Sequence, residues 1–376
     1  MNLTRREFLV IGGAVALSAC NRDRPPEPAS DLLLGGGRYR KGPDAPLEFV
    51  LSTVDIARAQ RATAALDFFP HGIHLNPAET RRVAIFEKIG PGACEFDREA
   101  NRVVRPIEAT KDHWFYGHGT YTADGQWLLC TEAQRTTTAG RIAIRDARSL
   151  ELAGVIPSHG HAPHECKLID GGKTLVVTNG GGPMNGPAPC VSYIDLASEK
   201  LLEKHEPSNS RLNTGHLAVA DDGSLVGVSA PRKGLENGGR GGVSIASPGR
   251  SLKTLTHPVE LVNQMLGEAL SVAIHNDSRT VAVTHPDANL LTLWRLADAE
   301  FIAEYSLDRP RGVALSRDLT AFIVSCGSAA GLLRLPLDTL VPEPEPIMRE
   351  SYITGSHLFS VANHFSEMGA LGPTAA

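Results

Sequence analysis

Five histidines recur at similar intervals along the chain, and they are the residues best suited to carry chemistry. They are His71, His118, His164, His216 and His357. Three of them stand at the same offset before an Asp-Gly pair, so they occupy equivalent places in a repeat. Neutral imidazole binds copper, iron, nickel and zinc. If the repeat brings these side chains together, they form a metal or anionic-ligand site, with His118, His164 and His216 as the predicted metal ligands.

Charged residues beside the same positions extend the predicted ligand-binding set. Glu165 follows His164, Glu268 lies shortly before the fifth copy of the repeat, and Arg311 immediately precedes the sixth. The full set is therefore His71, His118, His164, Glu165, His216, Glu268, Arg311 and His357. Imidazole suits copper, whereas an added carboxylate suits iron. The alternative is that each histidine is structural and hydrogen-bonds to neighbouring backbone.

The elements that must position these residues are short strands joined by tight turns. His118, His164 and His216 each lead through an Asp-Gly turn into a β-branched or apolar strand, and Asp-Gly between apolar runs is a strong hairpin signal. Weaker copies begin at His71, Ser271, Gly312 and His357. The spacing of roughly 41 to 55 residues suits a four-stranded propeller blade.

Seven copies predict an all-β, seven-bladed propeller over residues 31–376. The last copy has little chain after it, so residues before His71 must complete that blade: Arg38–Arg40, Phe49–Thr53 and the segment 63–69. Closure by both ends removes an exposed sheet edge. A pair of β-sandwiches is the alternative, which the near-regular period disfavours. One short helix is expected within 259–270.

In a propeller the innermost strands begin at one mouth of the axial channel, so equivalent positions on successive blades form a ring. The five histidines are therefore expected to line an axial funnel. His74 follows His71 at an odd spacing, which puts the two side chains on opposite faces of an extended strand. A shared ligand role for that pair requires a β-bulge.

The segments "FFPHGIHLNP", "YGHGTYTADG", "APHECKLIDGG" and "NTGHLAVADDG" carry a family resemblance. With the N-terminal signal described below, they resemble an exported bacterial family of seven-bladed, YVTN- and quinoprotein-like propellers of unknown function. Members of that family are often encoded beside imelysin-type iron-uptake proteins. The resemblance covers roughly residues 31–365 and implies the fold, with a role in periplasmic iron or metal handling as the accompanying expectation.

The first residues are typical of an export signal. Arg5 and Arg6 precede an apolar stretch that is too short to span a bilayer, which indicates the twin-arginine (Tat) route. Leu17-Ser-Ala-Cys20 resembles a lipobox, so residues 1–19 are predicted to be removed and Cys20 to carry lipid, with 20–30 as a tether. The alternative is cleavage at Ala14-Val-Ala16, with Cys20 left as a thiol. We expect a periplasmic monomer that is held at the membrane only through this anchor.

Composition and motifs narrow the function. Lys and Arg number 37 against 42 Asp and Glu, and this net charge of −5 disfavours nucleic-acid binding. The remaining cysteines form no Cys-x-x-Cys pair, and Cys130, Cys166 and Cys326 are expected to be buried thiols. Recognisable nucleophile and phosphate-loop motifs are missing. Binding of a small ligand or a periplasmic protein partner is favoured over catalysis, with a transition metal, iron or copper, as the candidate cofactor. The alternative is a lactonase-like hydrolase that uses His164, Glu165, His216 and Arg311.

Overall fold

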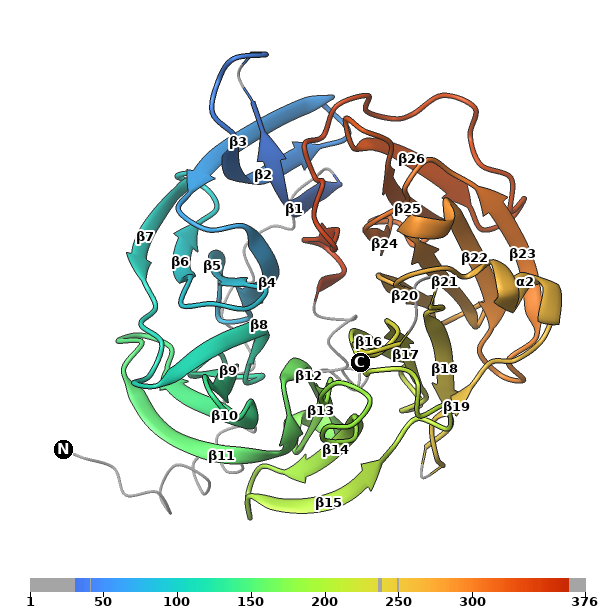
Figure 1. Cartoon of the computed structure of the whole chain (residues 1–376). Helices are drawn as coiled ribbons and strands as arrows, with labels where there is room; N and C mark the ends of the chain where they lie inside the picture. The colour runs from blue at the N-terminus through green and yellow to red at the C-terminus, as the bar shows by residue number, and fades with distance from the viewer. Residues whose placement is uncertain (1–30, 41, 236–238, 249, 365–376) are drawn as a thin grey trace, which may run out of the picture.

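The computed structural model describes residues 31–40, 42–235, 239–248 and 250–364. Arg5, Arg6 and Cys20 lie outside the described residues. Seven antiparallel sheets are arranged in a ring around a central axis (Figure 1). The predicted seven-bladed, all-β propeller is therefore confirmed.

Each blade runs from an innermost strand at the axis to an outer strand at the rim, in chain order for blades 1 to 6. The strands of blades 1 to 3 are β4 (Pro70–Asn76), β5 (Glu79–Glu87), β6 (Ala93–Asp97), β7 (Arg102–Pro106), β8 (His113–Tyr121), β9 (Trp127–Gln134), β10 (Ala139–Asp146), β11 (Leu152–His161), β12 (Pro163–Ile169), β13 (Thr174–Asn179), β14 (Cys190–Asp195) and β15 (Lys200–His205). The strands of blades 4 to 6 are β16 (Leu217–Val219), β17 (Leu225–Ser229), β18 (Gly242–Ala246), β19 (Lys253–Thr254), β20 (Val272–His275), β21 (Thr280–His285), β22 (Leu290–Arg295), β23 (Phe301–Ser306), β24 (Val313–Leu315), β25 (Ala321–Cys326) and β26 (Gly331–Pro336).

Blade 7 is built from both ends of the described chain. Its strand order is β27 (Phe359–Ser360), β1 (Leu32–Tyr39), β2 (Glu48–Asp55) and β3 (Gln60–Leu66). Leu33 and Leu34 of β1 pair with Ser360 and Phe359 of β27. The predicted closure is confirmed. Because the two ends of the described chain pair as strands within one sheet, the ring is closed by backbone hydrogen bonds and β1 is not left as an open sheet edge.

Blade 6 differs from the expected four strands, because its sheet has three. The segment after β26 contacts the sheet at an isolated bridge between Leu332 and Met348 and through a hydrogen bond from the N–H of Glu343 to the carbonyl of Arg334. This segment contains Pro342, Pro344 and Pro346. Proline lacks the N–H that a strand donates to its ladder, so a continuous fourth strand cannot form there.

The hydrophobic core lies between adjacent blades. Phe86 of blade 1 packs with Phe115 and Leu128 of blade 2, and Ile142 of blade 2 packs with Leu175 of blade 3. These side chains are almost fully buried. Each blade therefore depends on its neighbours for burial of both faces, which fixes the innermost strands relative to the axis.

A repeated hydroxyl also links neighbouring blades near the axis. Thr131, Thr178 and Thr284 each accept a hydrogen bond from the N–H that lies thirteen residues earlier on the innermost strand. The hydroxyl of Thr178 then donates to the carbonyl of Gly215, and that of Thr284 to the carbonyl of Arg311, both in the next blade. The hydroxyl of Thr131 lies 2.7 Å from the carbonyl of His118 in its own blade and 3.3 Å from that of His164 in the next. We call these three residues the threonine latches. Thr131 and Thr178 lie between the blades that carry His118, His164 and His216, whereas Thr284 lies between blades 5 and 6.

Helices are few among the described residues. The α-helix α2 (Val259–Gln264) occupies part of the predicted range, and the 3-10 turns are η1 (Asp170–Gly172) and η2 (Pro286–Ala288). None of these helices is long and apolar enough to cross a membrane. Cys94, Cys130, Cys166 and Cys190 are buried free thiols, and Cys326 is half-buried.

Candidate metal centre

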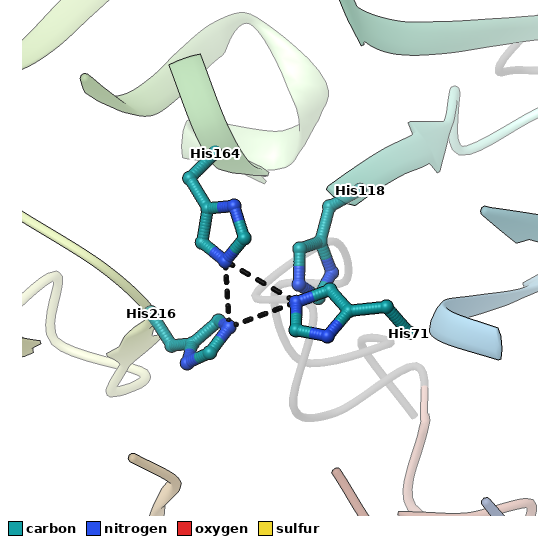
Figure 2. Close-up of side chains that lie close together, drawn as sticks. All are labelled: His71, His118, His164 and His216. Carbon is teal, nitrogen blue, oxygen red and sulfur yellow. Dashed lines mark hydrogen bonds between the residues drawn. The ribbon is translucent and has the colours of Figure 1, made fainter. Parts of the chain in front are cut away.

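The five repeated histidines meet at the propeller axis and form one cluster. The ring centroids of His71, His118, His164 and His216 lie 4.6–5.3 Å apart in every pair. His357 lies 4.1 Å from His216, 4.8 Å from His118 and 4.9 Å from His71. Figure 2 shows the first four side chains pointing toward one another from separate blades. We call these five residues the histidine cluster.

Local irregularities in the innermost strands aim three of these side chains inward. The pairing register shifts between Pro70 and Gly72, between Phe115 and Gly119, and between Pro163 and Cys166. His71, His118 and His164 fall within these three shifts. A bulge redirects a side chain that strict alternation would place elsewhere. The first shift supplies the bulge that a shared location of His71 and His74 requires, since both rings contact His118.

Glycines allow the rings to pack directly on the backbone. Gly117 has a φ of +118°, which side-chain-bearing residues rarely adopt. A Cβ built there would lie 2.7 Å from the His164 ring. A Cβ at Gly72 would lie 2.9 Å from Nδ1 of His118. Because glycine has no Cβ, Gly117 and Gly72 leave room for the rings of His164 and His118.

Three Nε2 atoms form a tight triangle, drawn with dashed lines in Figure 2. His71 and His164 are 3.2 Å apart at Nε2, His71 and His216 are 3.2 Å apart, and His164 and His216 are 2.8 Å apart. We call this set the Nε2 triangle. Nδ1 of His164 lies 2.7 Å from the carbonyl of Tyr116, and Nδ1 of His216 lies 2.6 Å from the carbonyl of Leu270.

These carbonyl contacts decide the tautomers of two rings. A carbonyl oxygen only accepts, so Nδ1 of His164 and Nδ1 of His216 must carry the protons. In neutral rings both Nε2 atoms then present lone pairs to each other across 2.8 Å. His71 can donate at most one proton from its Nε2. The contact between Nε2 of His164 and Nε2 of His216 therefore has two acceptors and no proton between them. A cation at the centre of the triangle removes this conflict.

His118 makes its close nitrogen contact outside the triangle. A ligand nitrogen of His118 is within 4.8 Å of those of His71, His164 and His216, but its Nδ1 is 3.3 Å from Nε2 of His74. Nδ1 of His71, Nε2 of His118 and Nε2 of His357 are buried without a hydrogen-bond partner. The cluster thus contains three further nitrogens whose bonding capacity is unused.

The cluster is largely buried and does not line the open funnel that we expected. His71, His118, His216 and His357 are 2%, 0%, 3% and 9% exposed, and His164 is half-buried. Desolvation lowers the pKa of His164 to about 3. Desolvation, with repulsion from neighbouring cationic groups, holds the pKa values of the other four well below the usual range. The rings are therefore neutral near pH 7, as metal ligation requires.

The three charged residues of the predicted set take other partners. Glu165 is buried, accepts the N–H of Leu217 and lies 3.7 Å from Nζ of Lys167. Arg311 donates from Nε to the carbonyl of Gly355. Glu268 pairs with Lys88 at 3.6 Å. The cluster itself is therefore built of imidazoles alone.

The Lys88–Glu268 pair joins two blades that are not neighbours. Lys88 follows β5 of blade 1, whereas Glu268 precedes β20 of blade 5. Blades 6 and 7 separate them on one side of the ring. Lys88 is also close enough to depress the pKa values of His71, His164 and His216. The ion pair thus spans the axis over the histidine cluster.

Sequence reasoning missed His364 and the threonine latches. His364 lies behind the cluster beside His74: its Nε2 accepts the Leu75 N–H, and its ring meets that of His74 edge-on at a centroid distance of 6.0 Å. His364 has no counterpart at a repeat position, so spacing gave no signal for it. The threonine latches do have a signal, since the offset of thirteen residues recurs with threonine in three blades and with Ser325 in blade 6.

Comparison with known proteins places the chain in a family. The profile of the protein family of unknown function DUF1513 matches residues 66–340, which is most of the chain. The chain belongs to this family. Curated protein sequences provide no match. Because the family description names no activity, it adds no chemistry to the site.

Solved structures show the same fold at low identity. Hydrazine synthase from Kuenenia stuttgartiensis superposes with a TM-score of 0.63 and 14% identity, covering 84% of this chain and 99% of that one. A protein from Lactobacillus plantarum gives 0.62 and 14%, covering 88% and 98%. A hypothetical selenium-binding protein from Sulfolobus tokodaii gives 0.63 and 10%, covering 83% and 89%. These similarities support the fold and leave function to the site.

Proposed function

We propose that this propeller binds a transition-metal ion at the Nε2 triangle of His71, His164 and His216. One observation carries the proposal: Nε2 of His164 and Nε2 of His216 lie 2.8 Å apart, and both present lone pairs because both Nδ1 atoms donate their protons to carbonyl oxygens. Ring nitrogens oriented through the opposite N–H to a carbonyl are typical of metal ligands.

The dimensions of the triangle fit such an ion. Metal–imidazole bonds are about 2.0–2.1 Å long, so two ligands at a right angle have nitrogens about 2.9 Å apart, and two at a tetrahedral angle about 3.3 Å apart. The observed separations of 2.8, 3.2 and 3.2 Å fall around this range. The donor set contains nitrogen only, which favours copper or zinc over iron. A shared proton is the competing occupant, but one proton bridges only two of the three Nε2 atoms, whereas a metal ion binds all three.

The cellular role that we propose follows from the N-terminal sequence and the family resemblance. Export by the Tat route delivers the folded propeller to the periplasm, where Cys20 holds it at the membrane. It there handles metal, alone or with a periplasmic protein partner. Two variants test this placement: Cys20→Ala should release the protein from the membrane, and Arg5→Lys with Arg6→Lys should block export. Retention of the Cys20 variant in the membrane contradicts lipidation at that residue.

Metal analysis tests the site directly. Protein purified from the exporting host without chelator or affinity tag should contain a transition metal by elemental analysis, and the metal-free protein should bind copper or zinc. His164→Gln and His216→Gln should lose this binding and keep the far-UV circular dichroism of the fold. His113→Gln, at the start of β8 and outside the cluster, is the control. If the His164 and His216 variants bind metal as tightly as the wild type does, the site is refuted.

The lactonase-like alternative gains no support from these contacts. Glu165 accepts the N–H of Leu217 and pairs with Lys167, and Nε of Arg311 donates to the carbonyl of Gly355, so these contacts engage both side chains with groups other than the Nε2 triangle. We therefore propose metal binding alone.

A further inference from the structure

His118 lies beside the Nε2 triangle without belonging to it. One ligand nitrogen from each of His71, His118, His164 and His216 lies within 4.8 Å of the other three. The centroid of the His118 ring is 4.8 Å from that of His71, 5.2 Å from that of His164 and 5.3 Å from that of His216. Figure 2 shows this ring next to that of His71, with His164 and His216 opposite. A fourth imidazole is therefore within reach of an ion held by the triangle.

The hydrogen bonding of His118 shows which of its nitrogens is available. Nδ1 of His118 lies 3.3 Å from Nε2 of His74, whereas Nε2 of His118 is buried without a hydrogen-bond partner. Buried polar atoms normally find a partner. When Nδ1 of His118 donates its proton to His74, Nε2 of His118 presents a lone pair. His74 then orients His118 in the same way that the carbonyl of Tyr116 orients His164.

The backbone of His118 is fixed, whereas its ring is held by few contacts. The hydroxyl of Thr131 accepts the N–H of His118 at 3.3 Å and donates to its carbonyl at 2.7 Å. The ring borders Gly72, where a Cβ would lie 2.9 Å from Nδ1. Nitrogens bound to one tetrahedral ion are about 3.3 Å apart, so an observed limit of 4.8 Å leaves an approach of at most about 1.5 Å. Rotation of the imidazole about its side-chain bonds covers this distance.

The other candidates for a fourth ligand are less well placed. The ring of His357 is 4.8 Å from that of His118 and 4.1 Å from that of His216, yet no nitrogen of His357 belongs to the close group of four. Glu165 and Arg311 are engaged with other groups. Within the part of the chain that the structure describes, His118 is the residue that completes the group.

We propose that Nε2 of His118 is the fourth ligand of the ion at the Nε2 triangle, and that His74 is its positioning residue. The ion is then held by four neutral imidazoles from blades 1 to 4, which are successive in the ring. This inference rests on the proposed function, because it requires an ion at the triangle.

A fourth imidazole decides what the site does with its ion. Catalytic zinc sites have three protein ligands and keep one position for water or substrate, whereas structural sites are closed by four. With His118 bound, no tetrahedral position is left for a substrate. The site therefore holds an ion as cargo or as a structural centre and does not catalyse hydrolysis. Four tetrahedral nitrogens suit zinc and monovalent copper, since divalent copper prefers a tetragonal arrangement.

Access of an added ligand to the ion tests the fourth position. Metal-free full-length protein is loaded with Co(II), whose visible absorption reports coordination, and is titrated with azide. The wild-type spectrum should not change. His118→Ala should bind azide because one position is open, and added imidazole should restore a four-nitrogen spectrum in this variant. His357→Ala is the matched control, since it removes a buried ring from the same cluster, and it should be as insensitive to azide as the wild type.

Two substitutions at His74 separate positioning from packing. His74→Gln keeps a side-chain acceptor for Nδ1 of His118 and should remain insensitive to azide. His74→Leu fills the space without an acceptor, so it should bind azide and lose about tenfold or more in Co(II) affinity. Equal behaviour of the two variants refutes the role of His74.

The outcomes distinguish this inference from the proposed function. A wild type that binds azide as His118→Ala does has an open position, which refutes the fourth ligand and leaves the triangle intact. An equal azide response in His357→Ala also refutes it, because loosened packing then explains both variants. X-ray absorption of the zinc-loaded wild type, which does not depend on a variant folding, should show four imidazole nitrogens, and a count of three contradicts the inference. A wild type that binds none of Co(II), copper and zinc refutes the proposed function itself.

Discussion

Acid should unfold this propeller at an unusually mild pH, because its histidine cluster must stay neutral to remain buried. Desolvation lowers the pKa values of all five cluster histidines in the folded chain. Histidine is charged when it is protonated, and these histidines have a lower pKa in the folded chain than in the unfolded chain. Their contribution to folding stability is therefore complete at pH values above the unfolded pKa. That stability is lost as the pH falls below the unfolded value toward the folded one.

The size of the effect follows from the number of rings. One pH unit below an unfolded histidine pKa of about 6.5, each ring that stays neutral has lost about 1.4 kcal/mol of stability. The buried His74, His285 and His364 have lowered pKa values as well, so eight rings together have then lost about 11 kcal/mol, against a total folding stability of about 5–15 kcal/mol for a typical domain. The midpoint is therefore expected between about pH 5 and 6 for metal-free protein.

Circular dichroism and tryptophan fluorescence across a pH series in urea measure this loss. The slope of the free energy of unfolding against pH should correspond to uptake of about eight protons on unfolding, five by the cluster and three by His74, His285 and His364. Copper at a free concentration one hundred times its dissociation constant should add about 2.7 kcal/mol and lower the midpoint by about 0.25 pH unit. His113→Gln should leave the midpoint unchanged. A metal-free native state that persists at pH 4, or uptake of a single proton, contradicts the neutral buried cluster.

Three further perturbations test how the fold holds the cluster. Gly117→Ala should weaken copper binding at least tenfold in a competition titration, because the added Cβ meets the His164 ring at 2.7 Å; unchanged affinity means that the ring has room. Thr131→Val removes one threonine latch and should lower the free energy of unfolding in urea by about 1–3 kcal/mol, whereas a change within error means that the latch is dispensable. Lys88→Met breaks the ion pair with Glu268 across the axis and should accelerate copper uptake in stopped-flow mixing, with the equilibrium stoichiometry unchanged. An equal or slower rate shows that this pair does not limit access.

The repeat was readable because a propeller imposes the same local rules on every blade. Asp-Gly turns between apolar runs mark hairpins independently of the rest of the chain, and His118, His164 and His216 share one offset from such turns. Seven copies predicted seven blades, and the shortage of chain after His357 predicted closure by β1 to β3. The fourth strand expected in blade 6 is missing because prolines interrupt its hydrogen bonding.

Sequence alone determined that the histidines return to one end of the axis, since equivalent positions in a closed ring must do so. Tertiary structure decided how they meet there. Bulges beside His71, His118 and His164 turned the rings inward, and carbonyls of Tyr116 and Leu270, remote in sequence from the rings they bind, fixed which nitrogens are free. Glu165, Glu268 and Arg311 are near the histidines in sequence but found partners elsewhere, because hydrogen-bond and ion-pair geometry depends on the approach of other blades. Spacing along a chain records which residues are equivalent, whereas coordination depends on angles and distances of an ångström or less, which only packing sets.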